Sequence, residues 1–125
     1  MPISVRMPND VLIVEDDAII ALDFEDTIRG FGVEAVRSAG NVARALKLID
    51  ERAPDFALLD VALASEKSFA VAECLQAMNI PFVFITGYGS KVALPPALRD
   101  TPTLPKPCTT DVLEAALRLR SRKGP

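Results

Sequence analysis

The chain has 125 residues, of which 50% are hydrophobic and 25% charged, and its 14 Lys and Arg against 17 Asp and Glu give a formal net charge of −3. This balance is typical of a folded soluble domain, and it excludes a disordered chain and a basic field for nucleic acid. No apolar run approaches the roughly 18 residues of a membrane span, and the first ten residues lack the apolar segment of a signal peptide. We therefore expect a single domain over residues 1–125, with its core at about 10–122, that works in the cytoplasm without nucleic acid or membrane partners.

The sequence contains no histidine and only two cysteines, Cys74 and Cys108. The cysteines stand far apart in unrelated contexts, so we expect packed thiols and neither a disulfide framework nor a zinc site. The lack of histidine excludes a serine-type triad and any phosphohistidine within this chain. A phosphoryl group carried on histidine would have to come from a partner.

Apolar runs bounded by turn residues predict five strands, and amphipathic patterns between them predict helices. In chain order the strands are expected at residues 11–14, 33–36, 56–59, 80–85 and 101–104. The helices are expected where apolar residues repeat at helical spacing, namely Ile20, Ala21, Phe24 and Ile28; Val42, Ala45, Leu46 and Ile49; Val71, Cys74, Leu75 and Met78; and Val112, Ala115, Ala116 and Leu119.

Polar residues and prolines mark the ends of several of these elements. Asn41 is expected to cap the second helix, and Asp111 with Glu114 has the spacing of a capping box for the last one. Between residues 87 and 100, two early glycines and the pair Pro95-Pro96 interrupt the pattern. We expect a loop there, with only a short helix that begins near the prolines.

The expected strands at 11–14, 56–59 and 80–85 are continuous apolar runs without alternation, which is typical of strands covered on both faces of a parallel sheet. Alternating strands and helices with short connections imply right-handed crossovers and a doubly wound α/β fold. Such a sheet leaves a crevice at the carboxyl ends of its strands, where the winding reverses. Functional residues are expected at that edge.

Polar side chains follow the apolar part of four predicted strands: Glu15 and Asp16 after the first, Asp60 after the third, Thr86 after the fourth and Lys106 after the fifth. Taken singly, each has an ordinary structural explanation, such as a helix cap or a solvated charge. In a parallel sheet, however, all of them converge on one edge. Three converging carboxylates repel and raise one another's pKa unless a cation is present, and oxygen ligands are those that Mg²⁺ prefers.

Carboxylates, Mg²⁺, a lysine and a hydroxyl together form a site for phosphoryl transfer, in which a carboxylate oxygen attacks phosphorus while cations neutralise the other oxygens. Asp60 is predicted to be the nucleophile because its strand lies next to the central first strand and it stands alone at the strand end. Glu15 and Asp16 form a pair suited to holding the metal.

Four segments in this order, VLIVEDD, FALLD, ITG and LPKP, resemble the receiver domain of two-component response regulators over about residues 10–122. The resemblance implies a flavodoxin-like sheet of five parallel strands in the order 2-1-3-4-5, with a short or irregular fourth helix. It implies that Glu15 and Asp16 hold Mg²⁺, Glu15 through water, and that Asp60 is phosphorylated. The backbone carbonyl of Ala62 would complete the metal shell.

The same resemblance implies that Thr86 bonds one phosphoryl oxygen and that Lys106 pairs with another. It further implies that the phosphoryl group comes from a histidine kinase or a histidine phosphotransferase, in agreement with the lack of histidine here. Asp17 falls outside the matched acidic pair, and we expect it to be a charge in the first turn of the first helix.

Three positions depart from the usual receiver pattern around the phosphoacceptor and the lysine. Ala64 and Ser68 stand where most receivers have a Pro and a Gly, which predicts a more mobile loop. Thr103 occupies the place of the Tyr or Phe whose inward rotation reports phosphorylation, so the usual switch cannot operate in that form.

The only tyrosine of the chain, Tyr88, lies two residues after the hydroxyl of Thr86. This region is similar to single-domain receivers with a Phe-Ala-Thr-Gly-x-Tyr motif, although Ile85 replaces the Ala and the Tyr stands one place early. Our hypothesis is that Tyr88 takes over the aromatic reporter role. The alternative is that it only packs on its loop.

The sequence thus predicts a stand-alone phosphoacceptor that receives a phosphoryl group on Asp60 with Mg²⁺ and signals to a downstream protein by contact. We do not expect it to be an enzyme, except that it would catalyse the transfer of the phosphoryl group to its own Asp60. A docking module that is not phosphorylated is the alternative, favoured only by Ala64 and Thr103. A small metal-dependent phosphatase is a third reading, but it would need an acid two residues after the nucleophile, where Ala62 stands.

Overall fold

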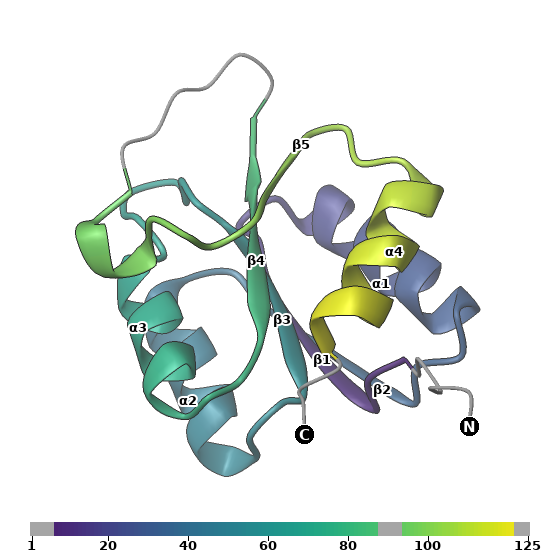
Figure 1. Ribbon diagram of the computed structural model, residues 1–125, viewed down its shortest axis with the longest axis horizontal. Helices are drawn as coiled ribbons and strands as arrows, with labels where there is room; N and C mark the ends of the chain where they lie inside the picture. Colours follow the sequence, from purple (N-terminus) through teal and green to yellow (C-terminus); the bar gives the residue numbers. More distant parts are fainter. Residues whose placement is uncertain (1–6, 88–93, 122–125) are drawn as a thin grey trace.

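The computed structural model, which describes residues 7–87 and 94–121, contains a parallel sheet between two layers of helices (Figure 1). The strands are β1 (Asp10–Val14), β2 (Ala35–Ala39), β3 (Phe56–Asp60), β4 (Phe82–Thr86) and β5 (Thr103–Pro105). They lie in the order β2-β1-β3-β4-β5, and each neighbouring pair is parallel. The predicted doubly wound α/β fold and its strand order are confirmed.

Two helices cover each face of the sheet. Figure 1 shows α1 (Ala18–Gly30) and α4 (Thr110–Ser121) on one side and α2 (Val42–Glu51) and α3 (Phe69–Ala77) on the other. Between β4 and β5 a single turn of 3-10 helix, η1 (Pro96–Leu98), begins at the predicted prolines. In the part of the chain that the structure describes, no helix combines the length and apolar character needed to cross a membrane.

Alternate residues of the interior strand β1 pack into two separate apolar clusters. Val11 and Ile13 belong to the cluster beneath α1 and α4, whereas Leu12 and Val14 belong to the cluster beneath α2 and α3. All four side chains are at most 1% exposed. Burial on both faces explains why the sequence of this strand is an unbroken apolar run.

The two edge strands begin later in the chain than the sequence predicts. β2 spans Ala35–Ala39 instead of residues 33–36, and β5 spans Thr103–Pro105 instead of residues 101–104. An edge strand buries fewer of its residues, so polar side chains such as Arg37 hide its apolar pattern. The pairing of β2 with β1, residue for residue along five positions, sets the observed register.

The buried face of α4 differs from the predicted apolar stripe by one position. Leu113 and Leu117 are 1% and 0% exposed and pack beneath the helix, whereas Val112 is 43% exposed. Val, Ala and Leu all occur on both candidate faces, so the periodicity alone could not distinguish them.

The predicted capping box at the start of α4 is also wrong. The backbone N–H of Val112 donates to the hydroxyl of Thr109 at 3.3 Å, so Thr109 caps the helix and Asp111 lies within its first turn. Glu114 instead forms an ion pair with Arg118, one turn later, at 3.0 Å.

Candidate functional site

Five predicted site residues meet at the carboxyl edge of the sheet. Glu15 and Asp16 follow β1, Asp60 ends β3, Thr86 ends β4 and Lys106 follows β5. The backbone N–H of Lys106 donates to the carbonyl of Thr86 at 2.7 Å, which continues the ladder between β4 and β5 past the last paired residues. The parallel topology therefore gathers residues that are up to 91 positions apart in sequence.

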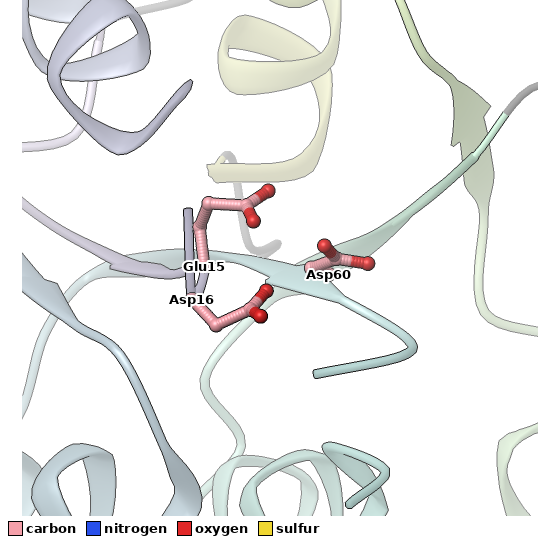
Figure 2. A group of neighbouring side chains, drawn as sticks. All are labelled: Glu15, Asp16 and Asp60. Carbon is pink, nitrogen blue, oxygen red and sulfur yellow. The ribbon is translucent and has the colours of Figure 1, made fainter. Parts of the chain in front are cut away.

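Three carboxylates form a cluster at this edge. Oxygen atoms of Glu15, Asp16 and Asp60 lie within 4.8 Å of one another, and Figure 2 shows the side chains projecting from the ends of β1 and β3 into a common space. Glu15 and Asp60 are 4% and 7% exposed, while Asp16 is exposed to solvent. Closely spaced carboxylate oxygens with one solvent-accessible member fit a hard divalent cation such as Mg²⁺.

The ammonium group of Lys106 bridges the two buried carboxylates. Its Nζ donates to Oε1 of Glu15 at 2.7 Å and to Oδ2 of Asp60 at 2.8 Å. Burial lowers the pKa of Lys106, but the hydrogen bonds and charges of Asp60 and Glu15 outweigh burial and raise this pKa above its ordinary value of 10.5. The lysine is therefore held as a cation at neutral pH.

Burial has the opposite consequence for Glu15. It raises the pKa of the Glu15 carboxyl, and the negative charge of Asp60 raises it further. The bonds from Lys106 Nζ and from the backbone N–H of Asp17, at 3.0 Å to Oε2, lower this pKa but do not cancel the rise. The site therefore makes ionisation of Glu15 less favourable than it is for a carboxyl in water, and a cation bound nearby would offset this effect.

The two oxygens of Asp60 have different partners. Oδ2 accepts from Lys106, and Oδ1 accepts from the backbone N–H of Ala62 at 3.2 Å. These bonds orient the carboxylate at the end of β3. Ala62 thus lies beside Asp60, as expected for a residue of the metal shell, and the role of its carbonyl stays a prediction.

Asp17 is separate from the acidic cluster. Its Oδ1 accepts from the backbone N–H groups of Ile19 at 2.9 Å and Ile20 at 3.2 Å, so it caps the N-terminus of α1. The expectation that Asp17 serves this helix is confirmed, although it stands at the cap, just before the first turn.

The two predicted switch residues differ in what the structure reveals. Thr103 is exposed on β5, and its hydroxyl donates to the carbonyl of Thr101 at 3.5 Å. Tyr88 lies outside the described residues, so its reporter role stays a prediction.

Sequence reasoning missed one contact close to this site. The carboxylate of Glu66, in the loop after β3, accepts from the backbone N–H of Val42 at the start of α2, at 2.9 Å. The two residues are 24 positions apart, and no local pattern signals their contact.

Comparison with known proteins assigns the chain to one family. Residues 11–118 match the response regulator receiver domain. The chain is similar to the phyllosphere-induced regulator PhyR of Methylorubrum extorquens, with 33% identity over 89 residues that make up 69% of this chain and 33% of PhyR. It thus spans only part of that relative, and only 42% of the length of a second curated relative.

Solved structures of another relative, SdrG, are similar to this chain over most of its length. The solution structure of SdrG from Sphingomonas melonis Fr1 has a TM-score of 0.76 and 41% identity, covering 92% of this chain and 96% of SdrG. The solution structure of the BeF3-activated conformation of SdrG from Pseudomonas melonis Fr1 has a TM-score of 0.73 and 40% identity, covering 87% of this chain and 92% of that one.

Proposed function

This chain belongs to the response regulator receiver domain family, and from that premise we propose that Asp60 accepts a phosphoryl group from the phosphohistidine of a histidine kinase or histidine phosphotransferase. The observation that carries this proposal is the setting of Asp60. It is a buried carboxylate with a lysine ammonium 2.8 Å from one oxygen and two further carboxylates within 4.8 Å. The proposed setting is the cytoplasm, and the output is contact with a downstream protein.

The acidic cluster would hold Mg²⁺ through Asp16, Asp60, the carbonyl of Ala62 and, through water, Glu15. When bound, the ion supplies positive charge that neutralises the phosphoryl oxygens during transfer. The donor set fits this ion because it consists of oxygens alone and carries three negative charges against the single positive charge of Lys106.

In the proposed step, one carboxylate oxygen of Asp60 attacks phosphorus in line with the histidine nitrogen of the partner. The bond from phosphorus to oxygen forms, the bond from phosphorus to nitrogen breaks, and the nitrogen keeps the electron pair. The product is an acyl phosphate on Asp60. Asp60 is buried and its two oxygens accept from Ala62 and Lys106, so the carboxylate is held in one orientation before the attack.

Two further residues would respond to the new phosphoryl group. Lys106 would exchange its bond to Oδ2 of Asp60 for a phosphoryl oxygen, and the hydroxyl of Thr86 would donate to another. Because Thr86 ends β4 and Lys106 follows β5, their movement would bias the β4–β5 edge of the sheet, a surface that a partner can read. The BeF3-activated conformation of the related SdrG supports such a second state.

Acetyl phosphate tests the proposal without the cognate kinase. We expect the intact protein, incubated with Mg²⁺ and acetyl phosphate, to gain the mass of one phosphoryl group. Asp60→Asn should show no gain, whereas Asp50→Asn, on the exposed side of α2, should gain it as the parent does. A parent chain that gains nothing would favour a docking module, and hydrolysis of acetyl phosphate without an adduct would favour a phosphatase.

A further inference from the structure

The loop between β3 and α3 turns back on itself directly after Asp60. Ala62 and Lys67 form an isolated antiparallel bridge, and the backbone N–H of Leu63 donates to the carbonyl of Glu66 at 2.8 Å. The N–H of Ala62, at the root of this loop, donates to Asp60. The conformation of the loop therefore fixes the group that orients the carboxylate.

Few apolar contacts can hold the far part of this loop in place. Residues 64–67 are all exposed to solvent, whereas Val61 and Leu63, on either side of Ala62, are buried in the apolar cluster beneath α2 and α3. A polar contact from residues 64–67 to a rigid element would therefore contribute a large share of the restraint on this exposed part of the loop.

Such a contact joins the loop to the first turn of α2. Oε2 of Glu66 accepts from the N–H of Val42 at 2.9 Å. Asn41 caps the same helix, as predicted, by accepting from the N–H of Arg44 at 2.8 Å. The helix has no acidic residue in its own first turn, so Glu66 places a carboxylate against its unpaired N–H groups and the positive end of its dipole.

The start of α2 also lies beside the acidic cluster. The N–H of Glu15 donates to the carbonyl of Ala39 at 3.0 Å, and a Cβ built on Gly40 would lie 4.0 Å from the carbonyl of Glu15. Gly40 and Asn41 then lead directly into α2. The contact of Glu66 with this helix therefore links the segment next to Glu15 with the loop that follows Asp60.

We propose that Glu66 is a positioning residue that clamps the loop of residues 61–67 to the N-terminus of α2 and so holds Ala62 in place beside Asp60. The effect on metal affinity rests on the proposed function, because Mg²⁺ binding would use the Ala62 carbonyl. The clamp itself is independent of any ligand. It is formed by residues of this chain alone.

Amide hydrogen exchange of the metal-free protein tests the clamp directly. In Glu66→Ala, the amides of Leu63 and Ala62 should exchange faster relative to the core amide of Ile13 than they do in the parent chain. Affinity for Mg²⁺, measured by titration calorimetry, should weaken about 3- to 10-fold, the scale expected when a residue that supports a metal ligand is removed. Glu66→Gln keeps an acceptor oxygen and should lie closer to the parent in both measurements.

Asn41→Ala is the matched control, because it removes a different cap from the same helix end. This variant should lower the stability of α2 but leave the relative exchange of Leu63 and the Mg²⁺ affinity unchanged. Unchanged exchange in Glu66→Ala, equal acceleration in both variants, or faster exchange without a loss of Mg²⁺ affinity would overturn the proposal. If even the parent chain bound no Mg²⁺, the proposed function would fail, and the exchange comparison would still decide whether the clamp exists.

Discussion

Adjacent acidic residues in this chain have different partners. The carboxylate of Asp16 faces Glu15 and Asp60, whereas that of Asp17 accepts two backbone N–H groups of α1. A run of three carboxylates in the sequence thus divides into a pair at the site and one helix cap. The division follows from the end of β1, after which only three residues lead into α1.

Substitution of each residue separates these roles. Asp16→Ala should weaken Mg²⁺ binding by about tenfold or more, because a metal ligand is lost. Asp17→Ala should lower the free energy of unfolding by about 0.5–2 kcal/mol, the usual cost of a lost cap, with little change in Mg²⁺ affinity. Calorimetric titration and urea unfolding measure the two effects, and equal losses of affinity in both variants would contradict the division.

Glu15 gives the site a pH dependence whose sign follows from burial. Its folded pKa is raised above 4.5, so the fold favours the protonated form. This contribution is fully present below pH 4.5 and is lost as the pH rises through the folded pKa. In EDTA, the free energy of unfolding of Glu15→Gln should therefore increase relative to that of the parent as the pH rises from 4.5 through the folded pKa of Glu15. Urea unfolding at a series of pH values checks this, and a variant that loses ground with rising pH would refute it.

At the scale of elements, α4 shows that packing against the sheet determines which face of a helix is buried. Leu117 is completely buried against the sheet, and Val112 is 43% exposed. Leu117→Ala should cost about 2–5 kcal/mol of stability through lost burial and a residual cavity. Val112→Ala should change stability by less than about 0.5 kcal/mol. Thermal or urea unfolding would distinguish this helix face from the one that periodicity predicts, for which Val112 would be the costly position.

The sequence could predict those strands whose residues are nearly all apolar, because such strands form unbroken apolar runs. Unbroken apolar runs located β1 and β3 because both strands are buried throughout. The bounds of the edge strand β2 were predicted wrongly because the strand contains the charged residue Arg37. Arg37 is partly buried in an ion pair with Asp10, a contact that the sequence pattern does not reveal. The contact of Glu66 with α2 was invisible because it depends on how the two loops meet in space.

The candidate site was more predictable than its surroundings, for a topological reason. In a parallel sheet the residue that follows each strand lies at one common edge, so Glu15, Asp16, Asp60, Thr86 and Lys106 could be brought together from strand positions alone. The bonds that Lys106 makes to two carboxylates at once depend on side-chain geometry, which the spacing of residues does not contain.

Across the whole molecule, the two edges of the sheet balance their charges differently. At the amino edge the carboxylate of Asp10 pairs with two guanidinium groups, those of Arg37 at 3.1 Å and Arg52 at 2.6 Å. At the carboxyl edge three carboxylates cluster, and the ammonium group of Lys106 pairs with two of them, Glu15 and Asp60. Negative charge is in excess where the proposed metal would bind, so this edge is the less stable one without a cation.

Binding of Mg²⁺ should accordingly stabilise the entire fold. At ten times the dissociation constant the linkage gain is about 1.4 kcal/mol, which should raise Tm by roughly 4–7 °C for a domain of this size. Differential scanning fluorimetry with MgCl₂ against NaCl of equal ionic strength measures it. The rise should disappear in Asp16→Ala, and an equal rise with NaCl would show general screening in place of a site.

The central claim is that Asp60 itself carries the phosphoryl group. After reaction with acetyl phosphate and Mg²⁺, borohydride reduces an acyl phosphate on aspartate to homoserine, and peptide mass spectrometry then locates the changed residue. We predict that the change maps to Asp60, and that it is absent when EDTA replaces Mg²⁺. A change at Asp16, Asp17 or any other carboxylate, with Asp60 intact, would contradict the account.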